Sequence, residues 1–70
     1  MGFIETESGW RSVQTWTTRA SAAREALRAE RIHNVPFITI ELEPEYLGAV
    51  PHFAIWTQWM PQADMSDLSK

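Results

Sequence analysis

Three glutamates stand at alternate positions, Glu41, Glu43 and Glu45, directly after an apolar segment. Alternate residues of a strand share a side, about 6.5 to 7 Å apart, so the three carboxylates form a row. This spacing is close to that of phosphates along a nucleic-acid strand. The row can therefore occupy Lys/Arg sites that bind phosphate. Protection of an edge strand is the alternative, because charges on an edge block unwanted pairing.

A second charged row, Arg24, Arg28 and Arg31, lies on one side of a predicted helix. Together with aromatic strands, such a row can contact the phosphates of RNA. The alternative is a solvated helix face, because Glu25 and Glu30 are interleaved with the arginines. No strand motif or GxxG loop of an RNA-binding domain is present. This row is a secondary candidate surface.

Catalysis requires a nucleophile beside a base, or a titratable pair held in a cleft. The chain has no cysteine, its lysine is Lys70, and its aspartates are Asp64 and Asp67, close to the end of the sequence. His33 and His52 are expected at a helix end and a strand start, as exposed or capping imidazoles, without metal-ligand spacing. We expect no enzyme activity, no metal site and no cofactor.

The elements that must position these residues belong to one small domain. The 70 residues are 44% hydrophobic and include four tryptophans, which excludes disorder. We expect a single α+β domain over residues 1–61 and a flexible tail over 62–70. No apolar run reaches the roughly 18 to 20 residues that span a bilayer, and no leader pattern is present. The sequence therefore predicts a free-standing intracellular protein without membrane contact.

The predicted fold is a small antiparallel sheet of three or four strands with one α-helix packed on one face, in the order β(β)αββ. Thr17 or Thr18 caps the helix, and Asn34 and Pro36 end it. The expected elements are strands over residues 3–7 and 10–17, a helix over 19–33, and strands over 37–43 and 52–60.

Alternation predicts the faces of these elements. In the strand 37–43, Ile38, Ile40 and Leu42 are expected inward. The outward residues of that strand are Thr39, Glu41 and Glu43. The apolar side of the helix is expected to hold Ala22, Ala23, Ala26, Leu27 and Ala29.

In a two-layer domain one face of the sheet is buried and the other is exposed to solvent. The strand 52–60 does not follow this rule. Large apolar residues alternate onto both of its sides, with Phe53, Ile55 and Trp59 on one and Ala54, Trp56 and Met60 on the other. One helix covers one face, so a second protein is expected on the other. That face is predicted to show Trp56 and one of Trp10 and Trp16, which share a side.

Charge indicates the chemistry of the partner. Residues 1–34 hold five arginines against four glutamates, a balance of +1, and residues 35–70 hold five acids against one lysine, a balance of −4. An acidic half repels phosphate, so direct nucleic-acid binding is disfavoured. A basic protein surface is the expected partner.

A cysteine-free, acidic chain of about this size, with a Trp-rich sheet, a carboxylate row and βαββ order, resembles the small phage-encoded anti-CRISPR proteins that act on type I systems. The resemblance covers the whole chain through size, charge and element order, without a signature motif. It implies a protein in the cytoplasm of an infected or lysogenic bacterial host, with Glu41, Glu43 and Glu45 blocking basic DNA-binding sites of a surveillance complex.

Two functions follow from the sequence. The first is a protein-binding inhibitor of a nucleic-acid-binding complex, and the second is a dimeric antitoxin-like or accessory phage regulator whose exposed sheet pairs with itself. The predicted partner-binding residues are Glu41, Glu43, Glu45, Trp56, Trp10 and Trp16.

Overall fold

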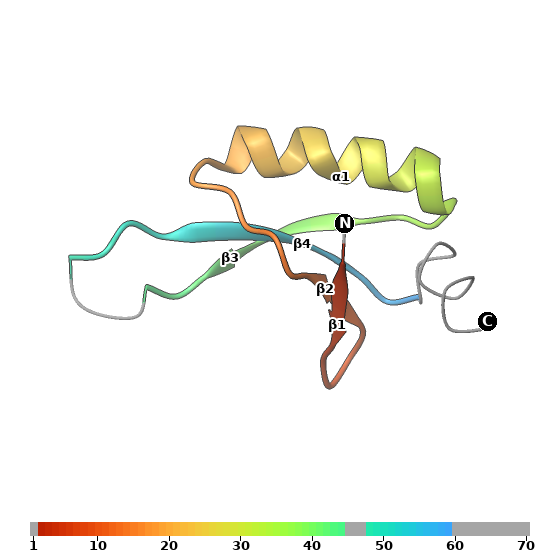
Figure 1. Ribbon diagram of the computed structural model, residues 1–70, viewed down its shortest axis with the longest axis horizontal. Coiled ribbons are helices and arrows are strands. Elements are labelled where there is room, and N and C mark those ends of the chain that lie inside the picture. Colours follow the sequence, from red (N-terminus) through yellow and green to blue (C-terminus); the bar gives the residue numbers. More distant parts are fainter. Residues whose placement is uncertain (1, 45–47, 60–70) are drawn as a thin grey trace.

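The computed structural model describes residues 2–44 and 48–59, which form one helix packed on a four-stranded antiparallel sheet. The predicted α+β fold is confirmed. The elements are β1 (Phe3–Glu5), β2 (Trp10–Ser12), α1 (Arg19–His33), β3 (Ile38–Leu42) and β4 (His52–Thr57). Figure 1 shows α1 lying across one side of the sheet, with the β1–β2 hairpin turned away from it.

The strands follow the order β1-β2-β4-β3, so β4 lies inside the sheet and β1 and β3 form its edges. The strand expected over residues 10–17 stops as β2 at Ser12. There the Ser12 hydroxyl accepts a hydrogen bond from the Ile55 amide at 3.1 Å and donates one to the Gln14 carbonyl at 2.8 Å. These side-chain bonds replace the backbone hydrogen bonds that would continue the pairing of β2 with β4. Trp16 rejoins the sheet through an isolated bridge to Phe53.

A compact turn joins β1 to β2. The Thr6 amide donates to the Gly9 carbonyl at 2.7 Å, and the Thr6 hydroxyl both donates to that carbonyl and accepts from the Gly9 amide. Gly9 lies directly against the backbone of Thr57 and the ring of Trp56. The turn is therefore packed onto the strand at the centre of the sheet.

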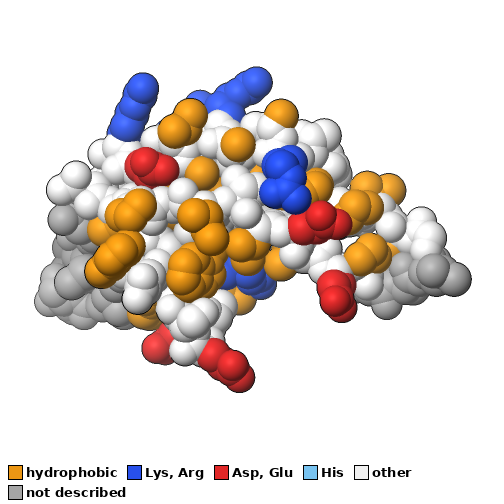
Figure 2. All heavy atoms as spheres, turned by 180° about the vertical axis from the view of Figure 1, so that it is seen from behind, with side chains coloured by type: hydrophobic (Ala, Val, Ile, Leu, Met, Phe, Trp, Pro, Cys, Tyr) orange, Lys and Arg blue, Asp and Glu red, His pale blue; other side chains and the backbone are white. Residues whose placement is uncertain are grey.

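The helix boundaries agree with the predicted 19–33. Thr18 is the N-cap, in extended geometry, and its hydroxyl accepts from the Ser21 amide at 3.2 Å. Asn34 ends the helix in the left-handed conformation, with φ of 58°, and its amide donates to the Glu30 carbonyl. The basic side chains of α1 project from the helix layer (Figure 2).

Replacing Thr18 by alanine is expected to lower the free energy of unfolding by about 1 kcal/mol, because a helix amide then loses its acceptor. Urea unfolding followed by tryptophan fluorescence measures this. Thr17→Ala is the matched control, since Thr17 is exposed and does not cap the helix. Equal losses in the two variants would contradict the assignment of Thr18 as the cap.

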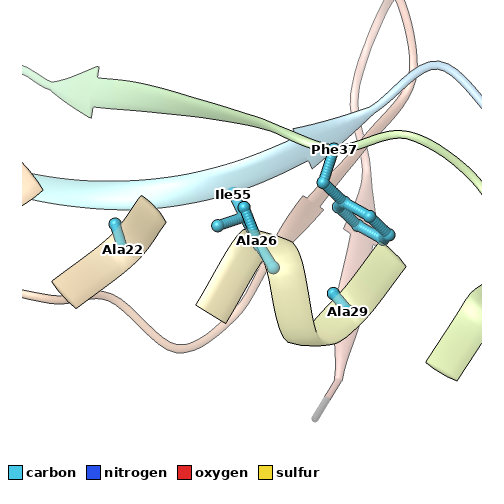
Figure 3. Close-up of a cluster of buried hydrophobic side chains, with 5 residues drawn as sticks. All are labelled: Ala22, Ala26, Ala29, Phe37 and Ile55. Carbon is cyan, nitrogen blue, oxygen red and sulfur yellow. The ribbon is translucent and has the colours of Figure 1, made fainter. Parts of the chain in front are cut away.

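The core lies between α1 and the sheet. Ala22, Ala26 and Ala29 face Ile55 and Phe37, and all five side chains are buried (Figure 3). Alanine lets the helix approach the sheet closely. The predicted helix side was too wide, because Ala23 and Leu27 are exposed, Leu27 by 63%. Each lies one residue, or about 100°, beyond the buried row.

His33 is buried, with 4% of its surface exposed, so of the two expected roles, exposed or capping, the exposed one was wrong. It continues the buried row one turn beyond Ala29. The Phe3 ring contacts it edge-on at 5.4 Å between centroids, and the Phe37 ring lies at 5.9 Å. β1 and the segment before β3 thus enclose the last turn of α1.

Candidate protein-binding face

The strand register shows which side chains of β3 face α1. Thr39 pairs with Ile55 and Glu41 with Phe53, and cross-strand partners lie on the same face of a sheet. Ile55 belongs to the core beneath α1 and Phe53 packs against that core. Thr39 and Glu41 are therefore on the helix side.

The apolar residues of β3 face the other way. Ile38, Ile40 and Leu42 alternate with Thr39 and Glu41, so they lie on the side opposite to α1. The predicted inward and outward sides of this strand were thus exchanged. The physical reason is that β3 is an edge strand: Phe37 and β4 fill the core, and Glu41 reaches solvent beside the start of α1.

One row of side chains on this second side crosses all four strands. Ile4 pairs with Arg11, Arg11 with Trp56, and Trp56 with Ile38. Ile4 is 42% exposed and Ile38 54%, while Arg11 and Trp56 are half-buried. We call this row, with its neighbours on β3, the open face: Ile4, Arg11, Trp56, Ile38, Ile40 and Leu42.

Figure 2 views the molecule from behind, where hydrophobic side chains gather across the middle. Others lie over the helix layer, and both basic and acidic side chains are interspersed among them. The molecule therefore presents a surface on which apolar and charged side chains are mixed.

Trp56 is held firmly in the open face. Its indole Nε1 donates to the Thr6 hydroxyl at 3.4 Å, and its ring packs against Gly9 in the β1–β2 turn. The hairpin thus fixes the orientation of the indole and covers part of it. A large aromatic side chain that is fixed before binding loses little conformational entropy in a complex.

The other predicted tryptophans lie elsewhere. Trp10 pairs with Thr57, which is on the same side of β4 as Ile55, and Trp16 packs against the core. Both therefore belong to the helix side, and the prediction that one of them joins Trp56 was wrong. Trp59 lies beyond the end of β4 and is 53% exposed.

The glutamates were expected on the same face as Trp56, but Glu41 lies on the helix side. The Glu41 carboxylate forms an ion pair with the Arg19 guanidinium, with 3.5 Å between oxygen and nitrogen. The same guanidinium lies 5.0 Å above the centre of the Phe53 ring. Glu43 follows the end of β3 and is exposed. Glu45 lies outside the described residues. Both partners of the Arg19–Glu41 pair are more than half exposed, so it contributes little stability.

The arginine row stays on the solvent side of α1. Arg24, Arg28 and Arg31 are exposed, and Arg28 lies 3.6 Å from Glu25. No tryptophan of the open face lies on this surface. The secondary candidate surface is thus separate from the open face.

An open groove lies where β3 ends and β4 begins. Its lining residues are Thr15, Leu42, Glu43, Pro44, Ala49, Val50 and His52. No hydrogen bond joins its hydroxyl, carboxylate and imidazole side chains, and residues 2–44 and 48–59 contain no group of three metal-ligating side chains. Sequence reasoning missed it because its lining residues Pro44, Ala49 and Val50 follow no periodic pattern.

Comparison with protein-family models, curated proteins and solved structures gives no match to this chain. Within the described part of the chain, no helix has the length and apolar character needed to cross a bilayer. The fold and the open face together define a small α+β protein with α1 on one sheet face and exposed apolar side chains, Ile4 and Ile38, on the other.

Proposed function

We propose that this protein is non-enzymatic and acts by binding another protein through the open face. The observation that carries the proposal is the row from Ile4 to Ile38, which crosses the whole sheet on the side opposite to α1. Contiguous apolar side chains at a surface mark interaction sites, whereas single exposed ones do not. Arg11 and Trp56 stand at the middle of the row.

Arg11 and Trp56 have the properties of binding anchors. Tryptophan and arginine are enriched among the few interface residues that carry most of the binding energy. Trp56 is oriented by Thr6 and flanked by Gly9, and Arg11 pairs beside it across the strands. Ile38 and Ile40 extend the contact along β3 as an apolar margin.

The charge of the protein favours a partner with a basic surface. The formal net charge is −3, and Glu43 at the end of β3 is exposed and makes no ion pair with the described residues. Such a surface is typical of nucleic-acid-binding complexes. We therefore propose an inhibitor of such a complex, in keeping with the resemblance to type I anti-CRISPR proteins. In this form the apolar row supplies affinity and the acids supply long-range attraction.

A pair of matched substitutions tests the role of the open face. Ile38→Glu places a charge on it, and Ile32→Glu makes the same change on α1, where Ile32 is similarly exposed at 60% against 54%. The probe is a purified type I CRISPR surveillance complex with its target DNA, and the measurement is the concentration of this protein that halves DNA binding. Ile38→Glu is expected to raise that concentration at least tenfold, and Ile32→Glu less than twofold.

The outcomes separate the parts of the proposal. Equal inhibition by wild type and Ile38→Glu would remove the open face as the contact surface. Absence of binding and inhibition by the wild type would reject the inhibitor of a type I complex. Glu43→Lys is expected to weaken binding relative to the wild type. The difference in affinity between the two proteins is expected to be larger at low salt than at high salt, because charge attraction is least screened there. An antitoxin-like dimer that pairs through the open face is favoured instead if Trp56→Ala, a change away from the edge of β3, converts a stable dimer to monomers and no complex is inhibited.

A further inference from the structure

We infer that two copies of this chain associate through the free edges of β3, antiparallel, with the twofold axis passing beside Ile40. β3 is one of the two edge strands, because the sheet order is β1-β2-β4-β3. This inference concerns the edge of the sheet and does not depend on the function proposed for the open face.

The backbone of β3 has donors and acceptors directed to the free edge. Phe53 of β4 uses its amide and its carbonyl for Trp16, at 2.7 and 2.8 Å, on the side away from β3. The pair Glu41–Phe53 is therefore a non-hydrogen-bonded pair of the antiparallel ladder. It follows that the amide and carbonyl of Glu41 point away from β4.

The same holds for Thr39. It pairs with Ile55, whose amide donates to the Ser12 hydroxyl on the β2 side at 3.1 Å. The amides and carbonyls of Thr39 and Glu41 thus face outward, and no described residue accepts from or donates to them along the edge. A second strand can accept these groups without disturbing β4.

The length of β3 gives this edge a centre. The strand runs from Ile38 to Leu42, so Ile40 is its middle residue. An antiparallel partner that uses the full length of the same strand must therefore place Ile40 opposite Ile40.

The side chains match in this register. On the open-face side, Ile40 meets Ile40 and Ile38 meets Leu42, so all three contacts are apolar. On the helix side, Glu41 meets Thr39, which avoids direct opposition of like charges. Arg19 already compensates the charge of Glu41 at 3.5 Å. Charge therefore does not protect the edge in this register.

The helices also fit. α1 packs against both β3 and β4, so its axis lies above these two strands. Strands in a sheet are about 4.8 Å apart, and a new β3–β3 pair thus places the two helix axes about 10 Å apart. Packed helices are separated by about 8 to 10 Å.

The facing flank of α1 suits close approach. Arg19 reaches Glu41 and the Glu30 carboxylate accepts from the Phe37 amide at 3.5 Å, so these residues mark the flank over β3. Ala23 and Leu27 follow Arg19 at four-residue spacing, and both are exposed. The small side chain of Ala23 and the apolar side chain of Leu27 therefore face the second helix in the dimer.

Single cysteines test the register directly, because the chain contains none. Non-hydrogen-bonded neighbours have Cα atoms about 4.5 Å apart, within the range of a disulfide. Ile40→Cys is therefore expected to give a disulfide-linked dimer after mild oxidation at low micromolar concentration. In Ile38→Cys, the cysteines of the two chains lie four residues apart along the paired strands. This variant is therefore expected to give at least tenfold less disulfide-linked dimer than Ile40→Cys. Equal linkage of the two variants would overturn the register.

Light scattering after size exclusion tests the dimer of the wild type from low to several hundred micromolar. Thr39→Pro removes an edge-directed amide and is expected to weaken the dimer at least tenfold, with circular dichroism unchanged. If this variant does not fold, Ala23→Arg provides the second test, since it obstructs the approach of the helices from an exposed position. A wild type that stays monomeric throughout, or a dimer unaffected by the variant tested, would overturn the inference.

Discussion

Replacement of Gly9 by alanine is expected to remove much of the folding stability of this protein. A Cβ at this position would overlap the Thr57 carbonyl oxygen and lie 2.6 and 2.8 Å from two ring atoms of Trp56. A backbone oxygen of the central strand cannot move without breaking the sheet. Overpacking costs about 1 to 3 kcal/mol, and we expect about 3 kcal/mol here. A domain of this size has about 4 to 10 kcal/mol in total.

Urea unfolding measures the loss, and the tryptophan fluorescence of the folded state reports displacement of Trp56. Gly2→Ala is the matched control, because its added carbon would meet only Val13 at 3.7 Å, an ordinary contact. Gly9 does not have a positive φ, so the effect comes from space and not from backbone conformation. Similar unfolding midpoints for the two variants would show that the turn does not pack on β4 as described.

Truncation of Ile55 is the second large effect. This side chain is fully buried between β4 and the alanines of α1. Removing its outer carbons loses their transfer free energy and leaves a cavity, because a helix seated on alanines has little side chain with which to fill it. Ile55→Ala is expected to cost about 3 to 4 kcal/mol.

Ile38→Ala provides the comparison, with an expected loss below about 1 kcal/mol because Ile38 is 54% exposed on the open face. The pair of variants tests the assignment of the two sheet faces. If Ile38 packed under α1, as alternation alone predicts, its truncation would cost as much as that of Ile55. Equal losses in denaturant unfolding would therefore reverse the assignment.

The sequence was sufficient for the elements but not for their faces. A run of strong helix formers between Thr18 and Asn34 predicts α1 at its observed bounds. Alternation in β3 shows that Ile38 and Ile40 share a side, but it does not show which side the helix takes. That choice depends on β4, where Ile55 and Phe53 lie under α1 and set the register for β3.

The candidate site was predicted in part. Trp56 was expected on the uncovered face, and its register with Arg11 and Ile38 places it there. Arg11 was missed because a lone arginine in a hairpin carries no periodic signal. Glu41 was expected on the uncovered face, but it lies on the helix side, where its partner is Arg19, 22 residues away in the sequence. Alternation carries no information about such a contact.

The position of β4 inside the sheet has a consequence for how the protein is made. β1 and β2 pair with each other, but only β4 connects this hairpin to β3. Before His52–Thr57 has been synthesised, the hairpin and β3 have no strand between them, and the alanines of α1 lack Ile55, their partner in the core. The four-stranded sheet therefore forms only after this strand has been made, and a chain that stops before it cannot complete the core.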